Sequence, residues 1–233
     1  MELHLTKKPS NVIIITGFPG VSLVGTITTK FLLDKLDTDA IGHIHSEELI
    51  PVVAVHKGEV IRPLGIFYNK QYNLVIVQAL SGILGLEWQV AHMVEKLSKE
   101  LKAKEIINIE SAVGFEGQIS TFYYTVDKER KKQFEQIGLE EMKEGVIMGA
   151  TSALLLNENS IPISTIFAKT HSNLPDYEAA AKMIDVLDKV LKMKLDYKPL
   201  MEKAKRFEAE LKNLMEQSQK KESKKSSELS YLG

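Results

Sequence analysis

A β-branched run near the N-terminus constrains the fold of this chain most. It reads Asn11-Val-Ile-Ile-Ile-Thr-Gly17 and stops at Phe18-Pro19-Gly20. An apolar run without polar alternation is typical of a strand that is covered on both faces, as in a mostly parallel sheet. The apolar residues that follow recur at helical spacing and predict a helix to about residue 36: Val21, Val24, Ile27, Phe31 and Leu32. A strand, a tight loop and a helix in this order indicate an α/β fold.

The alternation continues to about residue 195. Buried strands are expected over 73–80, 105–110 and 161–168, with helices over 86–102 and 176–194. Lys57-Gly58 predicts a hairpin between two short strands, 52–56 and 60–61. The remaining expected pieces are strands at 41–45, 64–68, 121–126 and 145–148 and helices at 128–136 and 149–156. Residues 1–195 are therefore predicted to form one three-layer αβα sandwich domain.

The last forty residues differ in kind from this domain. Pro199 suits the first turn of a new helix. Leu200, Ala204, Phe207, Leu211 and Leu214 then repeat at alternating spacings of four and three, which is the seam of a coiled coil. We expect a C-terminal coiled-coil-like helix over 196–222, an oligomer held by that seam, and a flexible tail over 223–233. Extending the register backward adds Met183, Val186, Val190, Met193 and Tyr197 to the seam.

Composition and charge exclude several classes of protein. The chain has 233 residues, no cysteine and a formal net charge of −1, so it has no disulfide scaffold, thiolate metal site or cysteine nucleophile. Its weak overall field does not favour nucleic acid or an anionic membrane as a partner. Residues 1–10 lack the apolar run of a signal peptide, and no segment reaches membrane-spanning length. We expect a cytoplasmic protein.

The glycine segment has two interpretations. Gly17, Pro19, Gly20 and Gly25 lie where α/β proteins often hold a phosphate at a helix N-terminus. Their spacing is neither Gly-x-Gly-x-x-Gly nor a P-loop. A tight turn in which Gly25 lets the helix lie close to the sheet is the structural alternative.

Histidines and serines offer further candidates, but they form no catalytic set. His43 and His45 share one face of a predicted strand and, with Glu47 or Glu48, could be imagined as a metal site. The other histidines are scattered, so hydrogen-bonded or solvated histidines are favoured and no metal is expected. Ser81 and Ser111 follow buried strands, yet neither has the Gly-x-Ser-x-Gly elbow of a serine nucleophile.

Three segments together carry a family resemblance. They are Gly17-Phe-Pro-Gly20-Val-Ser-Leu-Val-Gly25, Gln78-Ala-Leu-Ser-Gly82 and Glu110-Ser-Ala-Val-Gly114. With them, residues 8–195 resemble the proteasome assembly chaperone 2 family, and most closely its archaeal homologues. The resemblance implies a fold similar to nucleoside phosphorylases without their catalytic residues, no cofactor, and binding to 20S proteasome α subunits.

The resemblance also implies how such a protein docks. Some archaeal members resemble homo-oligomeric chaperones or ATP-independent activators that insert their C-terminal tails between α subunits. Their docking signal is a hydrophobic residue, Tyr and any residue at the end of the chain. Here the chain ends Tyr231-Leu232-Gly233, so the tyrosine is third from the end. Tyr231 would fill the aromatic slot, and the Gly233 carboxylate would meet a lysine.

Three hypotheses about function follow. The first is a non-enzymatic proteasome assembly chaperone homologue or activator that acts as a homo-oligomer. The second is a nucleotide- or nucleoside-binding enzyme of phosphorylase-like or ATP-grasp-like type that uses residues 17–25 and the strand ends near Ser81 and Ser111. The third is a scaffold whose coiled coil binds another protein.

Overall fold

The computed structural model describes residues 1–56, 58–80, 82–113, 121–157, 161–170 and 174–203. Nine strands form one sheet in the order β1-β3-β6-β7-β2-β8-β11-β9-β10. Their bounds are β1 (Glu2–Leu5), β2 (Ile13–Gly17), β3 (Asp39–His45), β6 (Leu64–Asn69), β7 (Leu74–Ala79), β8 (Glu105–Val113), β9 (Thr121–Thr125), β10 (Glu140–Glu141) and β11 (Ile163–Thr170). The strands β7, β2, β8 and β11 are parallel to one another. The predicted β-branched run is thus the centre of a mixed sheet.

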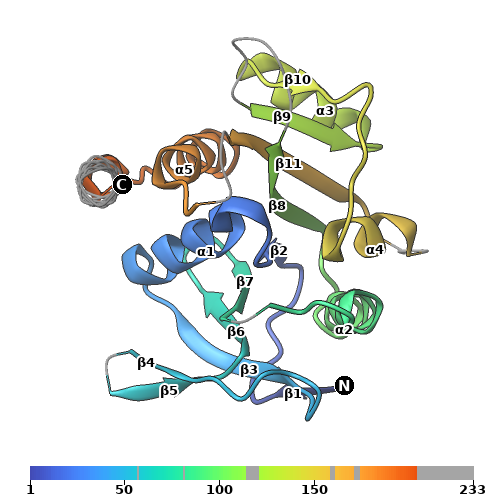
Figure 1. Cartoon of the computed structure of the whole chain (residues 1–233), viewed down its shortest axis with the longest axis vertical. Coiled ribbons are helices and arrows are strands. Elements are labelled where there is room, and N and C mark those ends of the chain that lie inside the picture. The colour runs from blue at the N-terminus through green and yellow to red at the C-terminus, as the bar shows by residue number, and fades with distance from the viewer. Residues whose placement is uncertain (57, 81, 114–120, 158–160, 171–173, 204–233) are drawn as a thin grey trace, which may run out of the picture.

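Helices cover both faces of this sheet. Their bounds are α1 (Val24–Lys35), α2 (Glu87–Glu100), α3 (Lys128–Gln136), α4 (Ala150–Leu156) and α5 (Tyr177–Leu191), with a short 3-10 turn η1 (Val21–Leu23) before α1. One apolar cluster joins α1 and α5 to the sheet, and a second joins α2 and α4 to the opposite face. Figure 1 shows α1 and α5 on one side of the strands and α2 and α4 on the other. The α/β prediction is confirmed. Among the described residues no helix has the length and apolar character of a membrane span.

Local sequence signals predicted several elements well. The helix expected at 128–136 is α3, and β4 (Ala54–His56) pairs antiparallel with β5 (Glu59–Ile61), as the predicted hairpin requires. Gly58 has a φ of +82°, which only glycine adopts readily, so a tight turn fits there.

At the sheet edges one predicted strand is absent and one observed strand was not predicted. Residues 145–148 form no strand; Val146 and Met148 are strongly exposed in the segment before α4. The edge strand in this region is instead β10, which pairs with β9. Strand β1 was not predicted, and it pairs antiparallel with β3. Apolar character alone suggested a strand at 145–148, whereas an edge strand needs a partner at the right position.

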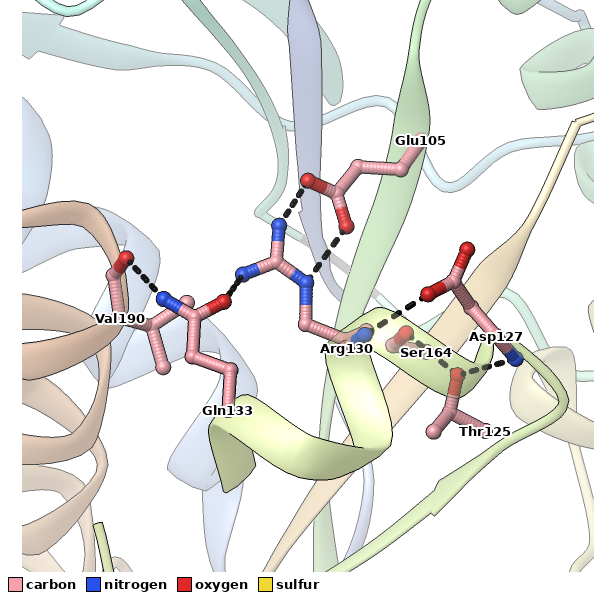
Figure 2. A network of polar contacts seen from close by, with 7 residues as sticks. All are labelled: Glu105, Thr125, Asp127, Arg130, Gln133, Ser164 and Val190. Atoms are coloured by element: carbon pink, nitrogen blue, oxygen red, sulfur yellow. Dashed lines mark hydrogen bonds and ion pairs between the residues drawn. The ribbon is translucent and has the colours of Figure 1, made fainter. Parts of the chain in front are cut away.

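A polar network attaches α3 to the sheet and to α5 (Figure 2). The Arg130 guanidinium donates to both carboxylate oxygens of Glu105 on β8, with Nε at 2.9 Å from Oε2. It also donates to the Gln133 side-chain oxygen, and the Gln133 amide donates to the Val190 carbonyl of α5 at 2.9 Å. The Asp127 carboxylate accepts from the Arg130 backbone N–H at 2.7 Å and caps α3. Arg130 and Gln133 together therefore connect α3 to β8 and to α5.

The chain after α5 folds back onto the body. Met183, Val186, Val190 and Met193 are buried in the core cluster of α1 and α5. The backward extension of the coiled-coil seam was therefore wrong, because a helix lying on a sheet has the same periodicity as a helix facing a partner. Residues 198–203 are helical, as Pro199 predicted, and Leu200 is only 3% exposed in that same cluster. The chain's own core thus continues past residue 195.

Candidate functional site

The glycine segment connects β2 to α1 by a close approach of two backbones. A Cβ added to Gly17 would lie 2.5 Å from the Gly25 carbonyl oxygen and 2.9 Å from the Thr29 methyl group. Real Cβ contacts of this length are essentially absent, so both glycines are required for the helix to start so near the end of the strand. Gly17 and Gly25 are brought together as the structural alternative predicted.

Gly20 is adjacent to a carboxylate. A Cβ on Gly20 would lie 2.5 Å from Glu110 Oε1, at the carboxyl-terminal part of β8. The same Oε1 accepts hydrogen bonds from the backbone N–H and the hydroxyl of Ser111, at 2.9 and 3.2 Å. The predicted loop and the predicted Glu110-Ser111 strand end therefore form one site, with Glu110 filling the space beside the loop. Pro19 is half-buried between the two glycines.

A chain of hydrogen bonds runs from the centre of the sheet to Glu110. Thr16 donates to Asn108 Oδ1 at 2.8 Å, and Asn108 Nδ2 donates to Thr151 Oγ1 at 2.9 Å. The Thr151 hydroxyl donates to Glu110 Oε2 at 2.8 Å. Thr16, Asn108 and Thr151 are completely buried. Since each hydroxyl and amide has a partner, the chain fixes the orientation of the carboxylate from β2, β8 and α4.

Sequence reasoning missed Thr16, Asn108 and Thr151. The signal was nonetheless present: Thr16 and Asn108 are polar residues inside otherwise apolar strands, and they lie directly opposite each other in the β2–β8 register. A polar residue at such a position needs a partner, because an unpaired buried polar group is costly. Two of them on neighbouring strands predict a hydrogen bond between the strands.

The electrostatics of the site change the acidity of the Glu110 carboxyl group. Burial raises the pKa of Glu110 above its ordinary value, and the hydrogen bonds from Ser111 and Thr151 oppose part of that rise. The Glu110 carboxyl group occupies the space beside the Gly20 backbone, where a phosphate would have to lie. The arrangement therefore disfavours nucleotide phosphate at the loop and points to a structural role for Glu110.

Replacing Glu110 with Gln is expected to change how stability depends on pH. Because the folded-state pKa is raised, the wild-type protein loses stability as pH rises from the ordinary glutamate range through the raised pKa. Glu110→Gln removes this loss, so its urea denaturation midpoint should fall less than that of the wild type between about pH 5 and about pH 8. Glu140→Gln, at an exposed carboxylate, is the control. Parallel pH profiles for wild type and Glu110→Gln would contradict the burial effect.

The other predicted candidates fall in different places. His43 and His45 lie on β3, and the His43 ring stacks on His4 of β1 at a centroid distance of 4.9 Å. No group of three metal-ligating side chains occurs in the part of the chain that the structure describes. Ser111 hydrogen-bonds to Glu110, while Ser81 lies outside the described residues.

The partner-binding residues remain predictions. The docking residues Tyr231, Leu232 and Gly233 lie outside the described residues, as do the seam positions Ala204, Phe207, Leu211 and Leu214. Of the five seam positions from Leu200 to Leu214 only Leu200 is described, and it packs within its own chain beside Tyr197 and Met201.

Comparison with known proteins places this fold in a family. The crystal structure of Pyrococcus furiosus PbaA, described as an archaeal homolog of proteasome-assembly chaperone, is similar with a TM-score of 0.82 and 26% identity over 97% of each chain. Pyrococcus furiosus PbaB, described as an archaeal proteasome activator, shares the fold with a TM-score of 0.74 and 19% identity, over 92% of this chain and 98% of PbaB. An uncharacterized protein of Methanocaldococcus jannaschii is 25% identical over 217 residues, 92% of this chain and 90% of that protein. The PAC2 family model matches residues 14–215. Since that match spans most of the sequence, the chain belongs to the PAC2 family.

Proposed function

We propose that this protein is a proteasome assembly chaperone homologue or ATP-independent proteasome activator. It forms a homo-oligomer in the cytoplasm and binds the 20S proteasome α ring through the C-terminal residues Tyr231, Leu232 and Gly233. The observation that carries the proposal is the near-complete correspondence with PbaA over both chains. The family membership of residues 14–215 supports the same class of function.

Exposed apolar side chains at one edge of the sheet support a role in protein binding. They lie at or after the carboxyl ends of the parallel strands, in the first turn of α2, or before α4 and α5, and we call them the apolar rim: Val21, Leu23, Leu84, Trp88, Val113, Met148 and Leu174. Leu84 is 95% exposed and Met148 78%. Apolar side chains gathered on a surface mark contacts with other proteins. The rim supports self-association of the body, independent of the tail.

An oligomer would make weak tails effective. When one tail is docked, the others are held near their sites, and linked binding can strengthen an interaction by about 10² or more without new contacts. A near-neutral chain, with a formal net charge of −1, has no strong field to attract a highly charged partner. The affinity for the α ring would then depend on the contacts of each tail and on how many tails the oligomer carries.

Deleting residues 229–233 is expected to weaken binding to purified 20S α rings by about tenfold or more. The oligomer mass should stay the same, because the deletion leaves the predicted seam and the apolar rim in place. Surface plasmon resonance with immobilised α rings measures the affinity, and light scattering measures the mass.

Two substitutions at Tyr231 distinguish the contribution of the aromatic side chain from the effect of shortening the chain. Tyr231→Phe keeps the ring and should retain binding, whereas Tyr231→Ala should resemble the deletion. Tail docking is wrong if the truncated protein, at unchanged mass, binds α rings as tightly as the full chain. Absence of α-ring binding by the full chain would contradict the proposed function itself.

A further inference from the structure

A second region of the molecule has the features of a ligand site. A pocket of about 620 Å³ lies between α1, the β4–β5 hairpin and strands β3 and β6. The hairpin is on the same side of the sheet as α1 (Figure 1). Small-molecule sites have volumes of roughly 300–1,000 Å³. The pocket is distinct from the Glu110 site, because neither Glu110 nor Gly20 lines it.

Gln78 is the most informative residue that lines this pocket. It lies on β7 and is 1% exposed, yet neither its side-chain oxygen nor its nitrogen has a hydrogen-bond partner among the described residues. Its register neighbours on the adjacent strands are Gly17 and Gly65, which have no side chains to offer. A buried polar group without a partner is costly. A bound molecule with a donor and an acceptor would satisfy both atoms.

The charges around the pocket leave one cation without a counter-ion. Lys7 pairs with Asp39 and Lys30 with Asp34, each at 2.7 Å, and all four residues line the pocket. Arg62, which follows β5, also lines it, and no described carboxylate pairs with Arg62. Its guanidinium is a planar set of donors that matches carboxylate or phosphate oxygens.

His43 adds a neutral polar group beside Arg62. The pKa of His43 is below its ordinary value, mainly because the ring is partly buried and next because Arg62 is nearby. Charge repulsion from His4 and His45 lowers the pKa of His43 further. A neutral imidazole leaves Arg62 as the uncompensated charge of the pocket. Apolar side chains of Leu33 and Phe67 line the same space. Among the described residues the lining thus combines a cation that no carboxylate pairs, polar groups and an apolar surface.

We propose that this pocket binds a small organic anion whose oxyanion is held by Arg62 and whose polar group hydrogen-bonds to Gln78. The apolar part of the molecule packs against Leu33 and Phe67. None of the residues of the apolar rim lines the pocket, so ligand binding does not require the proposed contacts with the proteasome.

Titration calorimetry with three probes tests the proposal on the full chain. N-acetyl-L-leucine carries a carboxylate, an amide and an apolar side chain; N-acetyl-L-leucinamide is its neutral analogue; inorganic phosphate carries only the oxyanion. N-acetyl-L-leucine is expected to bind saturably and at least about tenfold more tightly than the other two probes. Absence of saturable binding, or equal affinity for the neutral analogue, overturns the proposal. Phosphate binding as tight as that of N-acetyl-L-leucine also overturns it, because only an ion would then be recognised.

Three variants assign the binding to this pocket. Arg62→Gln and Gln78→Leu are each expected to weaken N-acetyl-L-leucine binding by about tenfold. Lys96→Gln removes an exposed charge on α2, across the sheet, and should leave the affinity unchanged. Arg62 is exposed, so its variant folds even if the buried Gln78 variant does not. Wild-type affinity in Arg62→Gln would place the binding elsewhere and contradict the proposal.

Discussion

Replacing Arg130 with Met is expected to lower the free energy of unfolding by about 3–5 kcal/mol. The Arg130 and Glu105 side chains are only 13% and 12% exposed, so the substitution leaves a carboxylate nearly out of water without its partner. It also removes the donor to the Gln133 side-chain oxygen, whereas the hydrogen bond from the Gln133 amide to Val190 of α5 does not involve Arg130 (Figure 2). The loss therefore includes the charge pair, the hydrogen bond to Gln133 and the attachment of α3 to β8. Urea denaturation at a fixed protein concentration measures it.

Two controls isolate the buried charge as the cause. Lys189→Met breaks the exposed Lys189–Asp185 pair on α5, whose side chains are 51% and 32% exposed, and should cost less than about 1 kcal/mol. The double variant Glu105→Met with Arg130→Met removes both charges and should recover most of the stability, because apolar replacement of a buried pair is often neutral. A double variant no more stable than Arg130→Met would show that the uncompensated carboxylate is not the cause.

Local patterns predicted the elements that depend on neighbouring residues. The β-branched run became β2 and the helical spacing after Gly20 became α1, since both signals lie within one short segment. The predicted helix 128–136 agrees with α3, whose Asp127 cap is a local contact. Register across the sheet could not be predicted in this way. The pairing of β1 with β3, for example, joins residues about forty positions apart.

The candidate site shows the same division between local and long-range signals. The close approach of Gly17 and Gly25 was predicted as a tight strand-to-helix turn, because both glycines belong to one segment. The contact of Gly20 with Glu110 could not be predicted, because it requires β8 to lie beside β2. Likewise, the unpaired Gln78 becomes visible only when Gly17 and Gly65 are found on either side of it. The sequence offered only one signal of this site, which is that Gln78 is a polar residue near the end of a buried strand.

Replacing Gly17 with Ala is expected to lower the free energy of unfolding by about 3 kcal/mol, at the upper end of overpacking effects. The new Cβ would meet two backbone atoms of Gly25, the carbonyl oxygen at 2.5 Å and the carbonyl carbon at 2.8 Å. Backbone cannot move aside as the end of a flexible side chain can, so α1 must shift away from β2. The shift would disturb the packing of α1 on α5, because Val24 and Phe31 of α1 lie in the same core cluster as Ile184 of α5.

The matched control is Gly82→Ala. A Cβ on Gly82 has no neighbour within 4 Å, and Gly82 is not among the glycines with positive φ, so alanine fits there. This variant should be neutral or slightly more stable than wild type, because alanine reduces the freedom of the unfolded chain. If both variants had the same urea midpoint, the contact of Gly17 with Gly25 would not determine where α1 begins. If only Gly17→Ala is destabilised, packing of α1 against β2 explains the glycine at position 17 of this chain, and phosphate binding is not needed to account for it.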